Sequence, residues 1–147
     1  MKTKLLDERG TTKTYAVVFD KNEEFVEGMT RFASEQGLDS SYFTAIGGFK
    51  DAVLEFFSPQ SMDYVPIPLS QQAEVLTMTG NVAMNGDERK VHAHCILGFI
   101  DGSTRGGHVK EAHVWPTLEV VVEESPSHLR RKDDSETGLA LLDLGSR

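Results

Sequence analysis

Histidines are the residues of this sequence whose spacing most directly suggests chemistry. His92 and His94 flank Ala93 within a β-rich run. Side chains two apart in a strand point to the same face of a sheet, so both imidazoles leave the strand together. The neighbouring Cys95 then faces the other side, with the core-forming residues of the run. The pattern therefore offers two nitrogen ligands side by side.

A third histidine follows on the next predicted strand. Asp101-Gly102 is a two-residue hairpin signal, and pairing across such a turn sets residue 95 opposite residue 108. We expect His108 to lie within about one residue of His94, depending on any bulge that the Gly106-Gly107 pair introduces. The hairpin thus brings a third imidazole to the first two.

Three convergent imidazoles suit a borderline-soft divalent ion, since zinc takes three protein nitrogens and leaves a fourth position for water or a substrate oxygen. A closed structural site would need a fourth ligand, commonly cysteine, and the only cysteine, Cys95, faces away. We therefore expect an open site in which His92, His94 and His108 hold Zn²⁺ or another divalent transition metal. The alternative is that these are ordinary strand histidines, exposed or hydrogen-bonded.

Charged residues near the predicted histidine site are candidates for assisting groups. Glu74 and Glu119 stand in β-rich runs, where an ionised carboxylate is costly unless it is exposed or paired. Either could orient a histidine or act as a proton-transfer base, and the alternative is the solvent face of a half-buried sheet. Arg105 is the third candidate catalytic residue. His113 is expected to be structural.

The elements that position these residues begin with a strand over residues 14–19. Asp20 and Glu23 have the spacing of a helix-start capping box. Apolar residues at helical spacing follow over residues 25–33, and Gly37 is a natural helix end. One amphipathic helix is therefore predicted to pack on a sheet.

The rest of the chain has the pattern of short strands. The runs are separated by Gly, Pro, Asn and Asp, as in an antiparallel meander, and cover residues 42–46, 52–57, 73–82, 91–97 and 118–122. Residues 58–69 contain Pro59, Pro66 and Pro68 and are predicted to form an extended surface loop. The fold class is therefore α+β, with an antiparallel β-sheet and one or two packed helices.

The composition shifts after residue 124, so we predict one domain over 1–124 and a tail or extension over 125–147 that packs on the domain or on a neighbouring subunit. Residues 130–132 form a basic triplet that could contact phosphate. The acidic residues of 133–136 favour a solvated tail instead. The leucine-rich residues 139–144 could add an edge strand or dock on a neighbouring subunit.

Composition narrows the function classes. The 147 residues are 39% hydrophobic and 26% charged, as in one ordinary globular domain, and no apolar run approaches the roughly 18 residues of a membrane helix. The N-terminus turns acidic after Leu5-Leu6, so no secretory leader is expected, and a lone cysteine suits a cytoplasmic location. The net charge of −8 disfavours a protein whose whole surface binds the phosphate backbone of a nucleic acid.

The order of motifs resembles the plants-and-prokaryotes conserved (PPC) domain over residues 11–124. The matching segments are Ala45-Ile46-Gly47-Gly48, the strand Ala73-Glu74-Val75-Leu76 continuing through Thr77-Met78-Thr79-Gly80-Asn81-Val82, Val91-His92-Ala93-His94-Cys95, Asp101-Gly102-Ser103-Thr104-Arg105-Gly106-Gly107-His108, and Pro116-Thr117-Leu118-Glu119-Val120-Val121-Val122.

This resemblance implies an α+β fold assembled as a homotrimer. It also implies that His92, His94 and His108 match histidines that hold a metal, zinc, near a subunit boundary in prokaryotic members. The family is described as DNA-binding because plant relatives carry an AT-hook, and this sequence has no Arg-Gly-Arg-Pro. At the level of architecture, the domain is also similar to acetolactate decarboxylase, a zinc enzyme with three histidine ligands.

Three functions follow from these observations. The family description predicts a DNA-binding or regulatory homotrimer with a three-histidine metal site, although the charge and the missing AT-hook disfavour direct DNA contact. The alternative is a zinc-dependent enzyme of lyase or hydrolase type, or a sensor of a small-molecule ligand, that uses the same site. In the third, the metal only stabilises the trimer.

Overall fold

The computed structural model describes residues 1–125 and 128–145, so the Pro126-Ser127 step of the predicted domain boundary lies outside the described residues. Within this part of the chain, one helix and nine strands occur. They are β1 (Lys2–Arg9), β2 (Thr12–Phe19), α1 (Phe25–Gln36), β3 (Ser40–Ser58), β4 (Asp63–Leu69), β5 (Ala73–Asn85), β6 (Glu88–Gly98), β7 (Thr104–Glu124), β8 (Arg130–Asp133) and β9 (Ala140–Asp143).

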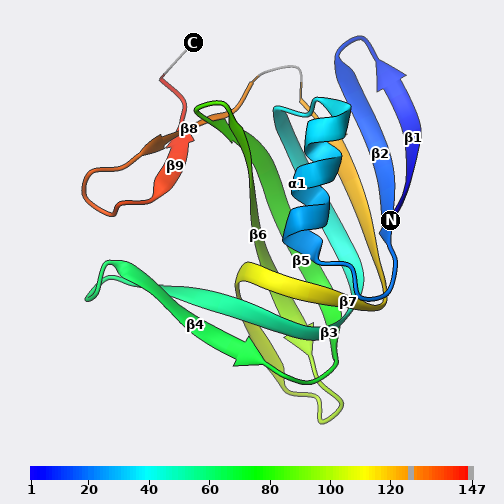
Figure 1. Cartoon of the computed structure of the whole chain (residues 1–147), viewed down its shortest axis with the longest axis vertical. Helices are drawn as coiled ribbons and strands as arrows, with labels where there is room; N and C mark the ends of the chain where they lie inside the picture. Colours follow the sequence, from blue (N-terminus) through cyan, green and yellow to red (C-terminus); the bar gives the residue numbers. More distant parts are fainter. Residues whose placement is uncertain (126–127, 146–147) are drawn as a thin grey trace.

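The predicted amphipathic helix is confirmed as α1, which covers one face of the sheet (Figure 1). Its apolar stripe, which includes Phe25, Met29 and Phe32, is fully buried. Gly37 ends the helix in the left-handed conformation at φ 67°, where its N–H bonds back to the last turn. No helix in the described part of the chain is long and apolar enough to span a membrane.

The helix starts later than the predicted capping box. The N-cap is Glu24, whose carboxylate accepts hydrogen bonds from the N–H groups of Val26 and Glu27. The Asp20 N–H does donate to Glu23 Oε2 at 2.8 Å, but this pair closes a turn before the helix. The spacing therefore identified a real side-chain cap, but this cap closes the turn before α1 and not the start of α1 itself.

The strands do not form a simple meander. The order along the sheet is β1-β2-β7-β3-β5-β8-β9, with β4 added to β3 and β6 paired with both β5 and β7. All pairings are antiparallel except the short parallel contact of β8 with β5. Because β3, β5, β6 and β7 each pair with two of the others, they close into a ring of strands. The meander prediction is wrong in that β7 inserts between β2 and β3.

Two long strands, β3 and β7, carry the sheet around the core. The separately predicted runs 42–46 and 52–57 are parts of β3, which bends where its register with β7 shifts. At Gly47 the two backbones approach so closely that a Cβ would lie 2.3 Å from the carbonyl oxygen of Thr117. The bend therefore requires glycine at this crossing, as the Gly47-Gly48 pair provides.

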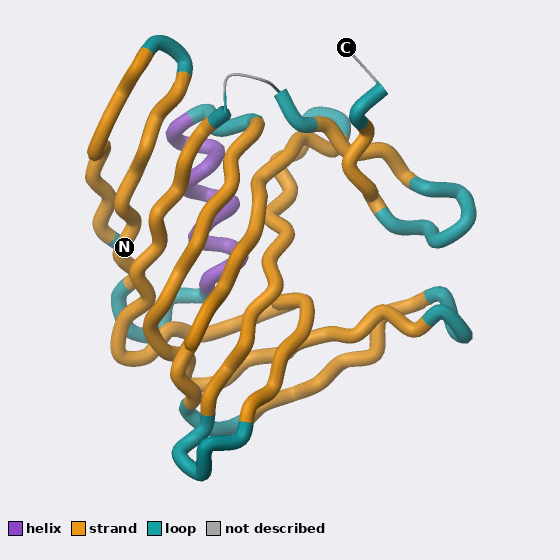
Figure 2. Tube along the Cα trace, turned by 180° about the vertical axis from the view of Figure 1, so that it is seen from behind, coloured by secondary structure: helices purple, strands orange, loops and turns teal. Residues whose placement is uncertain are grey.

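The predicted surface loop 58–69 is largely a strand instead. β4 covers Asp63–Leu69 and pairs with the second half of β3, and the two form an arm that projects from the body (Figures 1 and 2). Pro66 and Pro68 lie at alternate positions of β4, so both missing N–H groups belong to its free edge. An edge strand tolerates proline in that arrangement, and the proline-rich composition concealed the strand.

The outer face of the sheet, away from α1, is exposed and partly apolar. Alternation along the strands puts buried residues inside and several large hydrophobic side chains outside. The exposed ones on this face are Tyr42, Ile46, Leu76, Ile96 and Val121, each 46–60% accessible. No described element of this chain covers them.

The C-terminal residues form a hairpin on the edge of β5. β8 pairs with Met84 and Asn85, and β9 folds back on β8. In both views the hairpin projects on the same side of the body as the β3–β4 arm (Figures 1 and 2). Of the two placements that the sequence left open for the leucine-rich end, the one seen here is an edge strand.

Candidate metal centre

The hairpin between β6 and β7 sets the positions of the histidines. The turn signal at Asp101-Gly102 is confirmed, but the loop has one more residue than predicted: the Phe99 N–H donates to the Ser103 carbonyl, and the Gly102 N–H to that of Phe99. Gly102 is left-handed at φ 79°, the mark of a turn followed by a glycine bulge. The predicted register would have set His108 opposite Cys95, on the core face.

The observed register sets His94 directly opposite His108. Directly opposed residues share a face, so the bulge delivers His108 to the same side as His92 and His94. The Nε2 atoms of His92 and His94 are 3.1 Å apart, and the three rings have centroid separations of 5.1–5.5 Å. One nitrogen from each ring lies within 4.8 Å of the other two. The three histidines therefore converge on one point.

The environment favours the neutral form of His92 and of His108. Burial, followed by the charge of Arg131 and by the other two histidines, lowers the pKa of His92 to about 4. Burial and His94 also lower the pKa of His108, against an opposing effect of Glu55. Neutral imidazoles offer the lone pair that a metal ion needs, so the lowered pKa values of His92 and His108 favour metal binding.

The β3–β4 arm supplies two neighbours of His108. The Tyr64 ring stacks on the His108 ring with centroids 5.1 Å apart and planes inclined by 30°. Glu55 is paired with His108 in the β3–β7 register and is buried, and its Oε1 binds Lys110 Nζ at 2.7 Å. The arm thus fixes one ligand ring and brings a paired carboxylate beside it.

The C-terminal hairpin supplies a third neighbour. Arg131 donates from Nη2 to Asn81 Oδ1 at 2.6 Å and from Nη1 to the Ala140 carbonyl at 2.8 Å. Asn81 is the β5 partner of His92, so the guanidinium stands beside the histidines. The prediction that the basic triplet is a solvated tail is wrong for Arg131, because the hairpin folds this side chain into the site.

Between the arm and the hairpin lies a cavity of about 240 Å³. Its lining includes His92 and His108 on one side, Tyr64 on another, and Arg131 with Ala140 and Leu141 on the third. A small molecule in this cavity would therefore contact histidines, an aromatic ring, a guanidinium and an apolar wall.

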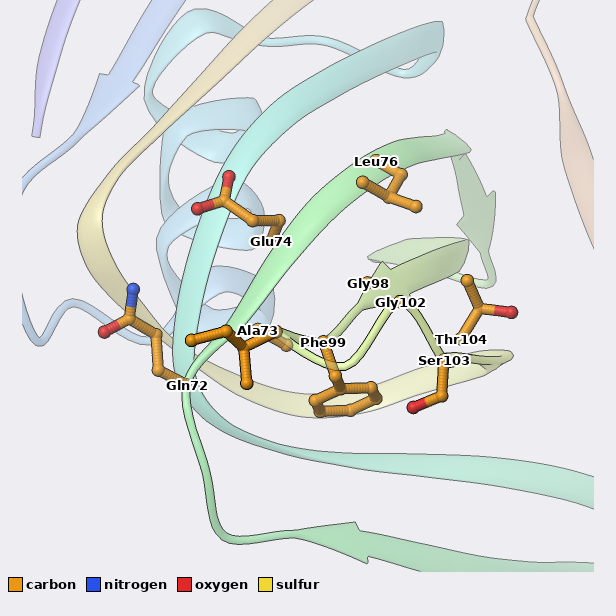
Figure 3. Close-up of a pocket in the computed structure, with 10 residues that line it drawn as sticks. Gln72, Ala73, Glu74, Leu76, Gly98, Phe99, Gly102, Ser103 and Thr104 are labelled. Carbon is orange, nitrogen blue, oxygen red and sulfur yellow. The ribbon is translucent and has the colours of Figure 1, made fainter.

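The predicted assisting residues lie away from the histidine cluster. Glu119 is on the second half of β7, opposite Ile46 and Val18. Arg105 pairs with Leu97, and its position in the strand puts it on the face opposite to that of His108. Glu74 borders a separate hollow of about 600 Å³ whose lining includes Ser103 and Thr104 (Figure 3).

The remaining singled-out residues have structural surroundings. His113 Nδ1 contacts Asp51 Oδ1 at 2.6 Å, away from the cluster, and His128 lies 3.9 Å from Asp39. Cys95 is buried on the core side, and burial raises its pKa to about 12. Trp115 is 36% exposed, with Lys21 Nζ 4.6 Å from the centre of its ring.

Three residues of the site were missed from the sequence: Glu55, Tyr64 and Arg131. A buried glutamate inside the apolar run 52–57 is a signal that could have been used. Tyr64 and Arg131 carry no such local signal, because long-range strand pairing brings both to the site. The pairing of β3 with β7 places the β3–β4 arm there, and the pairing of β8 with β5 places Arg131.

The donor set and its spacing fit a zinc-type ion. Nitrogens bound tetrahedrally at about 2.0–2.1 Å from zinc are separated from each other by about 3.3 Å. The 3.1 Å between the Nε2 atoms of His92 and His94 is close to that value. His108 Nδ1 is buried and has no hydrogen-bond partner among the described residues, so one ring nitrogen of the cluster lacks a protein partner. Three nitrogens would leave a fourth position open.

A sequence model of the Plants and Prokaryotes Conserved domain, abbreviated PCC or PPC, matches residues 6–126. The chain belongs to this family. Among solved structures, a PPC protein of Pyrococcus horikoshii superposes with a TM-score of 0.85 at 28% identity, over 96% of this chain and 100% of that one. A metal-containing protein of Archaeoglobus fulgidus gives 0.83 at 31% identity, over 97% and 99%.

Two further solved structures resemble this PPC protein. A candidate DNA-binding protein of Bacteroides thetaiotaomicron gives a TM-score of 0.85 at 25% identity, over 95% of this chain and 96% of that one. A Staphylococcus aureus protein similar to α-acetolactate decarboxylase gives 0.56 at 13% identity, over 78% and 53%, which is a likeness of fold alone. No protein of curated function matches this chain.

Proposed function

We propose that this PPC protein is a metal-dependent enzyme or sensor of a small molecule, in which His92, His94 and His108 hold Zn²⁺ or another divalent transition metal. The observation that carries the proposal is the convergence of the three imidazoles beside a cavity. The metal content of the Archaeoglobus fulgidus relative, 31% identical over nearly the whole chain, supports it. When bound, such an ion polarises a carbonyl or activates water.

The chain's own groups then have distinct parts. The three histidines bind the ion, and the stacked Tyr64 ring orients His108. Glu55, held by Lys110, places a carboxylate next to His108 and favours metal binding there by its charge. The candidates Glu74, Arg105 and Glu119 would take part only from another subunit, because their own subunit places them apart from the cluster.

Elemental analysis of protein purified without chelator or histidine tag tests the metal centre. We expect close to one zinc per chain in the wild type and loss of the metal in His94→Ala. His113→Ala is the matched control, since it removes a histidine outside the cluster. Zinc retained by His94→Ala, or lost equally in the control, would refute the ligand assignment.

We further propose that the protein is a homotrimer that buries the outer face of the sheet. The exposed Ile46 and Val121 side chains on that face support a protein partner. Light scattering should give about three times the chain mass of 16.3 kDa, and Val121→Glu should lower it. An unchanged mass for Val121→Glu would exclude this interface.

A third possibility is that the metal only stabilises the trimer. In that case, chelation will dissociate the wild type without any effect on the binding of a small-molecule ligand.

DNA binding is the second candidate function, favoured by the description of the Bacteroides thetaiotaomicron relative. The net charge of −8 opposes it, because contacts to phosphates need a local excess of Lys and Arg. A mobility shift of duplex DNA that weakens as salt rises towards physiological ionic strength would support this function. No shift at low salt would exclude it.

A further inference from the structure

The guanidinium of Arg131 is an uncompensated charge beside the metal centre. Its two described hydrogen bonds go to neutral oxygens, those of Asn81 and Ala140, and no carboxylate pairs with it in the described part of the chain. Its Nε is buried without a hydrogen-bond partner among these residues. A charge that is taken from water without a counter-ion is unfavourable, so the site has a place for an anion.

The surroundings of Arg131 define what kind of anion fits. The cavity also has Tyr64 and the ring faces of His92 and His108, and its third side is apolar, with Ala140 and Leu141. Burial lowers the pKa of the Arg131 guanidinium, yet an arginine stays protonated in proteins, so its charge persists in this cavity. The shape and lining suit a molecule with one anionic end and a short apolar part.

We propose that this cavity binds a small carboxylate, whose oxygens accept hydrogen bonds from Arg131 while its apolar part lies against Ala140 and Leu141, next to the open position of the three-histidine centre. The inference rests on the proposed function, because it names the ligand class of that same site. A guanidinium has five N–H donors in one plane, and its fork matches a carboxylate. Two Arg131 donors are already used, and the other cation that lines the cavity, Lys90, is paired with Glu88 at 3.4 Å, so few free donors are left for a phosphate dianion.

The carboxylate would then be selected by a part of the chain outside the conserved domain. The family match ends at residue 126, and Arg131 and its cavity wall lie on β8 and β9. The histidines come from the domain itself, whereas the charge complementary to the ligand comes from the C-terminal hairpin. Relatives that end in a different hairpin would therefore share the metal centre but not the ligand.

Calorimetric titration with isobutyrate, a carboxylate with a short apolar part, tests the inference. The uncharged isobutyramide is the matched ligand, and Arg130→Gln is the matched variant because Arg130 is exposed and does not line the cavity. We expect isobutyrate to bind the zinc-loaded wild type and Arg130→Gln alike. Binding to Arg131→Gln should be weaker by about tenfold or more, the range for a hydrogen bond to a charged group. Isobutyramide should bind the zinc-loaded wild type more weakly than isobutyrate does, by a similar factor.

A second variant controls for the case in which Arg131→Gln disrupts the C-terminal hairpin instead of removing only the guanidinium. Arg131→Lys keeps the charge but not the two-pronged donor, so we expect it to fold and to bind isobutyrate several-fold more weakly than the wild type. Equal affinities of the wild type, Arg131→Gln and Arg131→Lys would overturn the inference. So would the absence of any isobutyrate binding to the wild type at millimolar concentration.

Zinc content measured on the same samples separates the two proposals. If the protein contains zinc but its binding of isobutyrate does not depend on Arg131, the metal centre is supported and the inference is rejected. The titration is also run on metal-free protein. Isobutyrate binding that depends on Arg131 in a wild type unable to take up zinc would reject the metal centre and support the anion site.

Discussion

Gly80 links the core of the domain to the histidine cluster, and Gly80→Ala should damage both. Gly80 lies on β5 opposite Ala93, between the two histidines of β6. A Cβ built there would come 2.3 Å from Phe43 Cζ and 2.4 Å from the backbone carbonyl oxygen of His92. Neither neighbour is free to yield, since Phe43 is 1% exposed and packs on Phe25 of α1.

The size of the effect follows from these distances. A carbon–oxygen contact normally lies at about 3.3 Å or more, so the added methyl must open the β5–β6 pairing at His92 by roughly 1 Å or displace the Phe43 ring. Overpacking of this kind costs about 1–3 kcal/mol. For a domain of this length that corresponds to a fall of about 2–12 °C in melting temperature. A displacement of about 1 Å at His92 would also spoil a ligand geometry that tolerates only about 0.2 Å.

The assay is thermal unfolding followed by circular dichroism, with zinc content measured on the same samples. Gly98→Ala is the control, because its Cβ would meet only the flexible, exposed side chain of Leu76 at 3.0 Å. We expect Gly80→Ala to melt lower and to lose zinc while Gly98→Ala stays near the wild type. A Gly80→Ala protein that melts with the wild type and keeps its zinc would show that this close approach constrains neither the core nor His92.

Three further predictions concern single side chains. Tyr64→Ala should weaken zinc binding by about 2–10-fold, which is the contribution of an aromatic stack, whereas Tyr64→Phe should keep the wild-type affinity. Competition with a chromophoric chelator measures these affinities. Equal affinities in all three proteins would contradict the role of the stack. Burial raises the pKa of Glu124 above 4.5, so its contribution to stability is present below that unfolded-state value and is lost as the pH rises through the folded-state value. Glu124→Gln, which keeps an acceptor for the Asp39 and Ser40 N–H groups, should therefore lose less stability than the wild type in thermal melts as the pH rises above 4.5, and a parallel pH profile would refute this. The Cys95 thiol, with its pKa of about 12, should react slowly with a disulfide reagent at pH 8 and fully in guanidinium chloride; fast native labelling would show that the thiol is accessible.

The sequence predicted those features that depend on local periodicity. The buried stripe of α1 and the alternation of His92, Ala93, His94 and Cys95 both appear in the structure as the spacing indicated. The approach of His108 to within about one residue of His94 was also predicted, because only the two strands of one hairpin are involved, but the face on which His108 lies depends on the bulge at Gly102. Local pattern is sufficient where the partners are close in the chain.

Features that depend on turn geometry or on distant partners were not predicted. Asp101-Gly102 is compatible with a two-residue turn and with a bulged loop, and only the backbone of Gly102 decides between them. β1 has all eight residues exposed, so it carries no alternation of polar and apolar side chains. Arg131 sits in a charged run, and its burial depends on the pairing of β8 with β5, more than forty residues away in the chain.

The prolines of β4 also affect how this protein behaves at high concentration. A sheet edge with free N–H groups can add a strand from another molecule, which is a common route to fibrous aggregates. Pro66 and Pro68 remove two successive donors from the free edge of the arm, although Val65 and Phe56 on that arm are exposed and apolar. The arm can therefore expose apolar side chains on its face away from His108 without offering a template for strand addition by other molecules.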